Sequence, residues 1–187
     1  MLLLVGLGNP GSNYTNTRHN IGFKIIDAIN SHFKLSKQKP KFKGLLTTGT
    51  IGNKKVYAIK PLTFMNNSGI CIRELIEYFK IDPEDVIVFH DDLDVEFGKI
   101  KAKFGGSSAG RNGIASIDKF IGKDYSRVRI GIGKPKEKIE VGDFVLQNFE
   151  EDEMIGIEKV SNNIIDAISL LVEKKLDLFS STVNNNK

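Results

Sequence analysis

The residue in this sequence best suited to acid–base chemistry is His19, which lies within the polar segment of residues 14–20. Histidine is the side chain whose unperturbed pKa lets it accept and donate protons near neutral pH. Apolar residues 2–5 precede this segment and a helical pattern of isoleucines follows it, so we expect His19 between the first strand and the first helix. Loops held by a rigid scaffold often carry chemistry. The simpler alternative is a surface histidine near a helix N-terminus.

One carboxylate and three carboxamides are expected to gather beside His19. In a sheet with interleaved helices, the loops after the carboxyl ends of parallel strands meet at one edge. That rule brings together Asn9, Asn66, Asp91 and Asn112. His19 would take a proton from water, and Asp91 would orient the ring and stabilise its cationic form. Asparagine amides can donate to a carbonyl oxygen as it becomes an oxyanion. The set predicts a hydrolase without a covalent nucleophile, better suited to an ester than to an amide.

The elements that must hold these residues alternate between strand and helix patterns. Apolar runs or strict alternation predict strands at residues 2–5, 45–51, 56–59, 86–89, 99–104 and 127–133. Residues spaced for a buried helical face predict helices at 21–33, 72–79, 114–121 and 150–178. The Gly52-Asn53 pair is typical of a hairpin turn between two of the strands. The order predicts one α/β domain over residues 1–187, with a mixed β-sheet flanked by helices and a frayed tail at about 181–187.

The composition is that of an ordinary globular protein, with 187 residues, 40% of them hydrophobic and 27% charged. The single cysteine, Cys71, excludes an internal disulfide and fits a reducing compartment. The start lacks a basic segment and its apolar run is broken at Gly6, so we expect neither a signal peptide nor a membrane span. We therefore expect a cytoplasmic protein.

The formal net charge is +4, and the positive residues are unevenly placed. Lysines and arginines cluster at residues 34–43, 99–103 and 127–136, whereas acidic residues gather at 150–153. This separation indicates one positively charged face that could hold a polyanion. The alternative is an ordinary solvated surface.

Two short motif matches lack the context that their chemistry requires. Residues 6–11 match the G-x-G-x-x-G dinucleotide fingerprint, but Pro10 and the polar residues after Gly11 delay the helix, and Asp27 falls inside it instead of at a strand end. Residues 106–110 match the G-x-S-x-G nucleophile elbow. All three histidines precede that serine, which excludes the chain order of the serine hydrolases.

Residues 90–94, His-Asp-Asp-Leu-Asp, leave a metal-dependent hydrolase as an alternative, because carboxylates together with histidine can bind a divalent ion. No further cluster of histidines or carboxylates appears at a matching strand end. We therefore expect neither a metal nor a cofactor.

Several segments resemble the bacterial peptidyl-tRNA hydrolases in their order and spacing across nearly the whole chain. They are Gly6-Leu7-Gly8-Asn9-Pro10-Gly11, Tyr14-x-x-Thr17-Arg18-His19-Asn20-x-Gly22, Thr63-Phe64-Met65-Asn66-x-Ser68-Gly69, His90-Asp91-Asp92-Leu93-Asp94, Gly131-Ile132-Gly133-Lys134-Pro135 and Val141-Gly142-Asp143-Phe144-Val145-Leu146. The resemblance implies a monomeric, metal-independent α/β esterase. Such an enzyme cleaves the bond between a peptide and the terminal ribose of tRNA, and recycles tRNA from chains dropped by the ribosome.

The resemblance also implies roles for individual residues. His19 would accept the proton, Asp91 would hold it in its basic form, and Asn9 would help distinguish blocked from free aminoacyl-tRNA. The residues implied to line the site for the substrate end are Tyr14, Phe64, Met65, Asn66 and Asn112, and those matching basic positions that hold tRNA phosphate are Lys103 and Arg129. Each has an ordinary alternative: the aromatics as core edge, the asparagines as turn formers or caps, and the lysine as a solvated strand face.

Arg111 departs from the family pattern, in which a histidine usually precedes the residue that matches Asn112. Arginine keeps positive charge and donors but cannot shuttle protons at neutral pH. We therefore expect Arg111 to contact phosphate or ribose of the substrate instead of taking an acid–base role.

An RNA-binding protein that kept the fold and the basic face but lost catalysis is the alternative from another class. The presence of Asn9, His19, Asn66 and Asp91 argues against it. We expect an esterase that acts on N-blocked peptidyl-tRNA.

Overall fold

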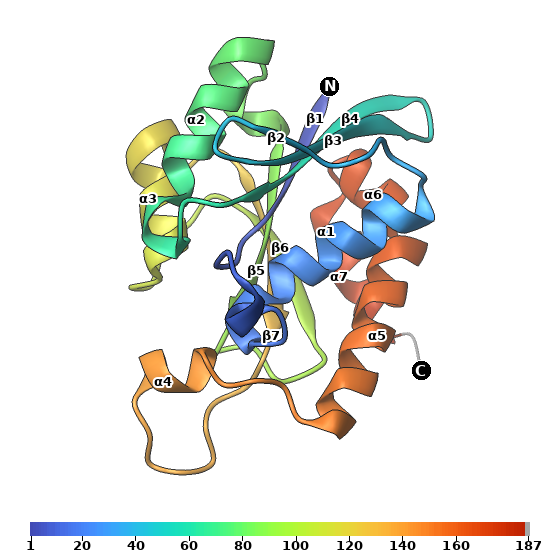
Figure 1. Cartoon of the computed structure of the whole chain (residues 1–187). Coiled ribbons are helices and arrows are strands. Elements are labelled where there is room, and N and C mark those ends of the chain that lie inside the picture. The colour runs from blue at the N-terminus through green and yellow to red at the C-terminus, as the bar shows by residue number, and fades with distance from the viewer. Residues whose placement is uncertain (186–187) are drawn as a thin grey trace.

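The apolar first strand lies in the middle of a seven-stranded mixed sheet. The computed structural model describes residues 1–185 and is drawn in Figure 1. The strand order is β2-β3-β4-β1-β5-β7-β6, with bounds Leu2–Gly6 (β1), Lys39–Lys41 (β2), Gly44–Ile51 (β3), Lys54–Pro61 (β4), Val86–Asp92 (β5), Ile100–Phe104 (β6) and Ser126–Gly131 (β7). Strands β4, β1, β5 and β7 are parallel neighbours, whereas β2, β3 and β6 are antiparallel to the strands beside them. The predicted α/β class with a mixed sheet is confirmed.

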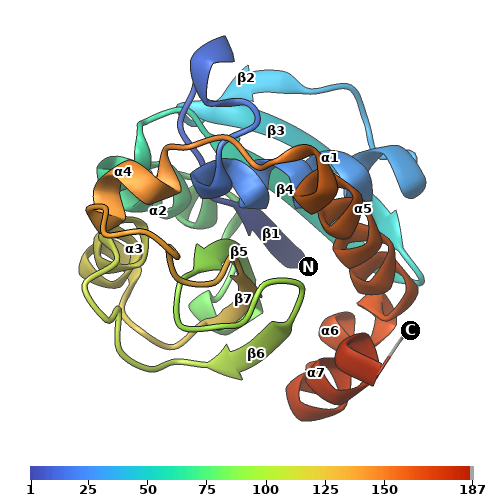
Figure 2. The ribbon, with the colours of Figure 1, turned by 90° about the horizontal axis from the view of Figure 1, so that it is seen from below.

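Helices cover both faces of this sheet. The α-helices are Ile21–His32 (α1), Ser68–Phe79 (α2), Asn112–Ile121 (α3), Val141–Val145 (α4), Glu151–Asp166 (α5), Ile168–Val172 (α6) and Leu176–Asn185 (α7), and the 3-10 turns are Ser12–Tyr14 (η1), Arg18–Asn20 (η2), Met65–Asn67 (η3) and Pro83–Asp85 (η4). Figures 1 and 2 show α2 and α3 on one face and α1, α5, α6 and α7 on the other. Within residues 1–185, no helix is both long and apolar enough to cross a membrane.

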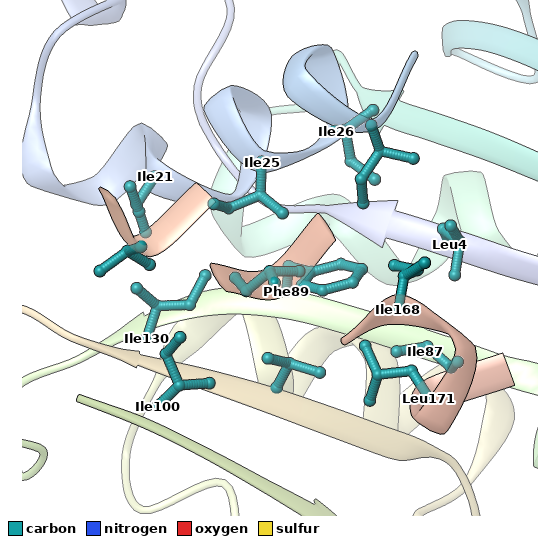
Figure 3. Packing of buried hydrophobic residues seen from close by; sticks show 14 of the residues in the cluster. Leu4, Ile21, Ile25, Ile26, Ile87, Phe89, Ile100, Ile130, Ile168 and Leu171 are labelled. Atoms are coloured by element: carbon teal, nitrogen blue, oxygen red, sulfur yellow. The ribbon is translucent and has the colours of Figure 1, made fainter. Parts of the chain in front are cut away.

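The alternation of side chains along β1 explains why the sheet has a hydrophobic core on each face. Leu2 and Leu4 point toward α1, whereas Leu3 and Val5 point toward α2 and α3. Figure 3 shows the first core, in which Leu4 and Phe89 of the sheet lie beneath the isoleucines of α1. Burial on both faces explains why this strand is a continuous apolar run.

The single long helix predicted for residues 150–178 is wrong, because the structure has three helices there. Helix α5 ends before Ala167, α6 follows at once, and Lys174 in the next turn has φ 60°, a left-handed conformation that ends a helix. Periodicity detects a buried face but not such breaks, since a kinked chain can keep its apolar residues on the same side.

The frayed tail predicted for residues 181–187 is wrong for residues 181–185, which belong to α7, while 186–187 lie outside the described residues. The Asn184 carboxamide accepts from the N–H of Ile100 at 2.9 Å and donates to its carbonyl at 2.8 Å. Ser180 accepts from the N–H of Ala102 at 2.9 Å. Side chains of α7 therefore satisfy backbone groups of the edge strand β6, which orders the end of the chain.

The prediction of one positively charged face is wrong for the first basic cluster, because that cluster and the second lie at opposite edges of the sheet. Lys39 and Lys41 belong to the edge strand β2, and Lys101 and Lys103 belong to the other edge strand, β6. Six inter-strand spacings of about 4.8 Å separate these edges. The second cluster and the β7 part of the third, at Arg127 and Arg129, lie beside the site described below.

Gly22 lets α1 approach the ends of β1 and β5 closely. A Cβ atom added there would lie 2.4 Å from the Leu7 nitrogen and 2.4 Å from the Phe89 oxygen, two backbone atoms that hydrogen-bond to each other. We expect Gly22→Ala to lower the free energy of unfolding by about 1–3 kcal/mol or more, as overpacking does. Denaturant titration measures this change.

Gly142→Ala is the matched control. In the described part of the chain, a Cβ added there meets no atom within 4 Å outside its chain neighbours and the backbone of its own helix. A helical Gly→Ala change without a clash is neutral or slightly stabilising. Equal stability of the two variants would contradict the close approach at Gly22.

Candidate active site

A cavity of about 730 Å³ opens at the carboxyl edge of the central parallel strands. Eight predicted site residues line it: Asn9, His19, Phe64, Met65, Asn66, Asp91, Arg111 and Asn112. The loop after β1, the loop after β4, the end of β5 and the start of α3 contribute these side chains. The arrangement places acid–base and amide groups around one space, as expected for loops that follow parallel strands.

The His19 ring is joined to the Asp91 carboxylate, although 72 residues separate them in the chain. His19 Nδ1 lies 2.9 Å from Asp91 Oδ2. Because a carboxylate accepts only, Nδ1 carries the proton of the neutral ring and donates it. Nε2 is then the basic nitrogen. A ring fixed in this tautomer, with its side chain 23% exposed, can accept a proton from a bound water.

Strand β5 continues to Asp92, beyond the end predicted at residue 89. It lies between β1 and β7, and the pairing of Asp92 with Gly131 extends the ladder. Adjacent residues of a strand point to opposite faces. Asp91 therefore meets His19, whereas Asp92 meets Arg129 on the other side.

The pKa of His19 lies above its ordinary value. Burial lowers it, but the negative charge of Asp91 and the hydrogen bond to that carboxylate together raise it by more. The neutral ring is the form that accepts a proton. Activity that depends on it should rise as the pH increases through a pKa above 6.5.

We expect Asp91→Asn to move the acid limb of the pH–rate profile to lower pH. The carboxamide oxygen still accepts from Nδ1, but the charge that raises the His19 pKa is gone while the burial that lowers it remains. The rate on the pH plateau should also fall, by no more than the 10²–10⁴-fold that a positioned base supplies. Values of kcat/KM, determined from initial rates between about pH 5 and 9, measure both the position of the acid limb and the rate on the plateau.

Asp124→Asn is the matched control, because Asp124 is exposed and precedes β7 at the opposite edge of the sheet. It removes one carboxylate without touching His19. An acid limb that stays in place in Asp91→Asn, or that shifts equally in the control, would contradict the role of Asp91.

Hydrogen bonds hold Asn9 so that its side-chain nitrogen, Nδ2, remains free to donate. Asn20 accepts from the Asn9 N–H at 2.8 Å and donates to the Asn9 carbonyl at 2.9 Å. Asn9 Oδ1 accepts from the Met65 N–H at 2.8 Å. With its oxygen used, Asn9 offers Nδ2 to a ligand in the cavity. Asn20, which is 2% exposed, was not predicted as a site residue; its place directly after His19 was the only signal.

Phe64 has a strained backbone at the mouth of the cavity, with φ 59° and ψ 158°. Such a conformation costs a residue with a side chain about 1–3 kcal/mol. Two hydrogen bonds hold this conformation in place. The Met65 N–H donates to Asn9 Oδ1, and the Asn67 N–H donates to the Phe64 carbonyl at 3.1 Å. Phe64 is 52% exposed. With Val141 and Leu146 of residues 141–147, the α4 segment, it gives the cavity an apolar rim.

Arg18, another residue that was not predicted to have a role in the site, connects this rim to the segment that holds His19. Its guanidinium lies 4.2 Å from the centre of the Phe144 ring and donates to Glu153 at 3.0 Å. Its backbone N–H donates to the Gln147 carbonyl at 3.0 Å. The α4 segment is therefore fixed to the residue next to His19.

Three predicted site residues do not line this cavity. Tyr14 is half-buried in η1. Lys103 and Arg129 line a second, adjacent cavity of about 90 Å³, and Arg111 lines both. Arg127 does not form a free basic face with them, because it is 1% exposed and paired with Asp118 at 2.9 Å.

The geometry does not support the dinucleotide or metal alternatives. Gly11 precedes a 3-10 turn, and Asp27 lies within α1, paired with Lys60 at 2.6 Å. In residues 90–94 the side chains have separate partners: the His90 ring bonds the Asp91 carbonyl at 2.9 Å, and burial lowers its pKa to about 4. In the described part of the chain, no three potential ligand side chains converge.

Comparison with known proteins gives one consistent result. The model of a family described as "Peptidyl-tRNA hydrolase" matches residues 3–187. A peptidyl-tRNA hydrolase of Pelagibacter ubique (strain HTCC1062) is 77% identical over 185 residues, 99% of this chain and 100% of the relative. That of Bacillus subtilis (strain 168) is 43% identical over 175 residues, 93% of each chain. The crystal structure of peptidyl-tRNA hydrolase from Acinetobacter baumannii is 34% identical, with a TM-score of 0.92 over 100% of this chain and 96% of that one.

Proposed function

This chain belongs to the peptidyl-tRNA hydrolase family and is a hydrolase, and we propose that it cleaves the ester between an N-blocked peptide and the terminal ribose of tRNA. Its products would be the free peptide and reusable tRNA. The observation that carries the mechanism is the 2.9 Å pair of His19 and Asp91 in the wall of the cavity. We further propose that it acts as a monomer in the cytoplasm.

In the proposed reaction, His19 Nε2 takes a proton from water while the water oxygen attacks the ester carbonyl carbon. The Asp91 carboxylate stabilises the imidazolium that forms. The tetrahedral intermediate then breaks its bond to the ribose oxygen, which receives the proton from His19. Atoms and charges balance without a covalent enzyme intermediate or a metal.

The amide groups of the cavity supply the second part of the mechanism. Asn9, whose oxygen is already bonded, would donate to the carbonyl oxygen as it becomes negative, and Asn66 and Asn112 lie in the same wall. Preorganised donors of this kind contribute roughly 10²–10³-fold each. The apolar rim at Phe64 would hold the acyl part of the substrate.

RNA binding would fall to the small cavity beside the site. Lys103 and Arg129 lie there, next to the catalytic cavity and on strands β6 and β7. Burial lowers the pKa of Lys103, and the positive charges of Arg129 and Arg127 lower it further, which marks a local excess of cations. A phosphate would neutralise that excess.

The test is release of the acyl group from an N-acetyl-aminoacyl-tRNA, compared with the same tRNA carrying a free amino group. We expect multiple turnovers on the blocked substrate and much slower release from the free one. Tight binding without turnover by folded protein would support the inactive RNA-binding alternative. Loss of turnover with a chelator would support the metal-dependent one.

A further inference from the structure

The cations around the small cavity keep donors that the protein does not use. Arg129 donates to Asp92 through Nε at 2.6 Å, and Arg111 donates to Asp92 and Asp94 through Nη2. Within residues 1–185, the two Nη nitrogens of Arg129 and the Nε and Nη1 nitrogens of Arg111 make no hydrogen bond, and nor does Lys103 Nζ. These nitrogens are available to a ligand.

Asp92 holds both guanidinium groups at once. Its side chain is only 1% exposed, and its Oδ1 accepts from Arg111 while its Oδ2 accepts from Arg129. Burial raises the pKa of Asp92, but the bond from Arg129 and the charge on Arg111 lower it by more, so it remains a carboxylate. Asp92 thus binds each arginine through one of its nitrogens, and this bond orients the donors that remain free.

The size and charge of the small cavity indicate the class of ligand. Its volume of about 90 Å³ leaves room for a small group such as a phosphate. Four cationic side chains and two carboxylates line it: Lys103, Arg111, Arg127, Arg129, Asp92 and Asp94. Guanidinium groups with free paired donors match the oxygens of a phosphate.

We propose that Asp92 is a positioning residue that orients Arg129 and Arg111, and that Arg111 is the third cation, with Lys103 and Arg129, of a seat for one phosphate of the bound RNA. The identity of the anion as RNA rests on the proposed function. The orientation of the arginines by Asp92 does not.

Shared structural elements join this phosphate seat, formed by Lys103, Arg111 and Arg129, to the catalytic cavity. Asp92 follows Asp91 on the same strand, and Arg111, which lines both cavities, precedes Asn112 at the start of α3. A phosphate held by Arg111 is therefore placed relative to His19 by two rigid elements. Loss of the phosphate contact should therefore change KM for the tRNA substrate more than kcat.

Binding of deacylated tRNA to Asp92→Asn tests the role of Asp92 by the sign of its effect. Removing a negative charge should tighten binding of a polyanion if the carboxylate acts only through its field. If Asp92 positions the arginines, its loss should weaken binding on the order of tenfold, the equivalent of one charge-assisted contact. Tighter or unchanged binding by folded Asp92→Asn would overturn the proposal.

Arg111→Ala provides a second variant at a partly exposed side chain, in case the buried substitution fails to fold. Removing one phosphate contact should reduce the slope of log Kd against log salt by about 0.9. Lys159→Ala, an exposed lysine of α5, is the control and should leave the slope unchanged. An Arg111→Ala slope equal to that of the wild type would overturn Arg111 as a phosphate ligand.

These measurements use uncharged tRNA, so they do not depend on hydrolysis. A protein that fails to release peptide but shows both effects would contradict the proposed function and retain the seat. A protein that releases peptide but shows neither the weaker binding of Asp92→Asn nor the reduced salt slope of Arg111→Ala would support the proposed function and contradict the seat.

Discussion

Replacing His19 with alanine should lower kcat on N-acetyl-aminoacyl-tRNA by about 10²–10⁴-fold, the contribution of a positioned general base. Nε2 is the basic nitrogen of a ring whose other nitrogen is bonded to Asp91, and alanine offers no base in its place. Affinity for deacylated tRNA should change little, because the cations of the small cavity are untouched. Single-turnover rates and a binding titration separate the two quantities.

The substitution also leaves the Asp91 carboxylate, whose side chain is 8% exposed, without its partner. An uncompensated buried charge can cost several kcal/mol. His19→Asn is therefore made in parallel, because its amide can still donate to Asp91 but cannot act as a base. His32→Ala, at an exposed histidine at the end of α1, is the matched control. Wild-type turnover in His19→Asn would remove His19 from the mechanism.

Replacing Asn9 with aspartate should lower kcat by about 10²–10³-fold, the value of one oxyanion donor. Aspartate keeps an oxygen that can accept from the Met65 N–H, but it replaces the carboxamide NH₂ of Asn9 with a negative oxygen. The variant therefore separates donation to the substrate from support of the backbone. Rates should be measured on the pH plateau, since a new carboxylate would raise the pKa of His19.

Asn9→Ala completes the comparison, because it loses both the donor and the support of Met65. If Asn9 only supports the backbone, the alanine variant should be impaired and the aspartate variant nearly normal. If Asn9 donates, both should be impaired. Asn53→Asp, in the exposed turn between β3 and β4, controls for the added charge. Near wild-type kcat in Asn9→Asp would refute donation.

The sequence was sufficient to predict the fold class, because its signals are local. Each face of β1 is buried, so its residues are all apolar, and the hairpin of β3 and β4 forms around Gly52-Asn53 as predicted. The helical periods of α1, α2 and α3 also correspond to real helices. The main errors are at 150–178, where breaks at Ala167 and Lys174 divide the helix, and at 181–185, where Asn184 bonds the backbone of β6 far away in the chain.

The candidate site was predictable as a set of residue types but not as a set of contacts. Strand ends and parallel connections were enough to bring Asn9, His19 and Asp91 to one edge of the sheet. The contact of Arg18 with the α4 segment has no local signal, since the partners of Arg18 lie more than a hundred residues away. The support of Asn9 by Asn20 has only one, the place of Asn20 directly after His19.

By itself, therefore, the sequence determined which chemistry is available: one histidine, its carboxylate, amides and a basic strand edge. Only the tertiary structure decided how adjacent acids divide the work. Asp91 and Asp92 are chemically alike, but the extension of β5 along β7 turns one toward His19 and the other toward Arg111 and Arg129. The direction of a side chain on a strand depends on where the strand ends and how it pairs, and that pairing is made by residues distant in the chain.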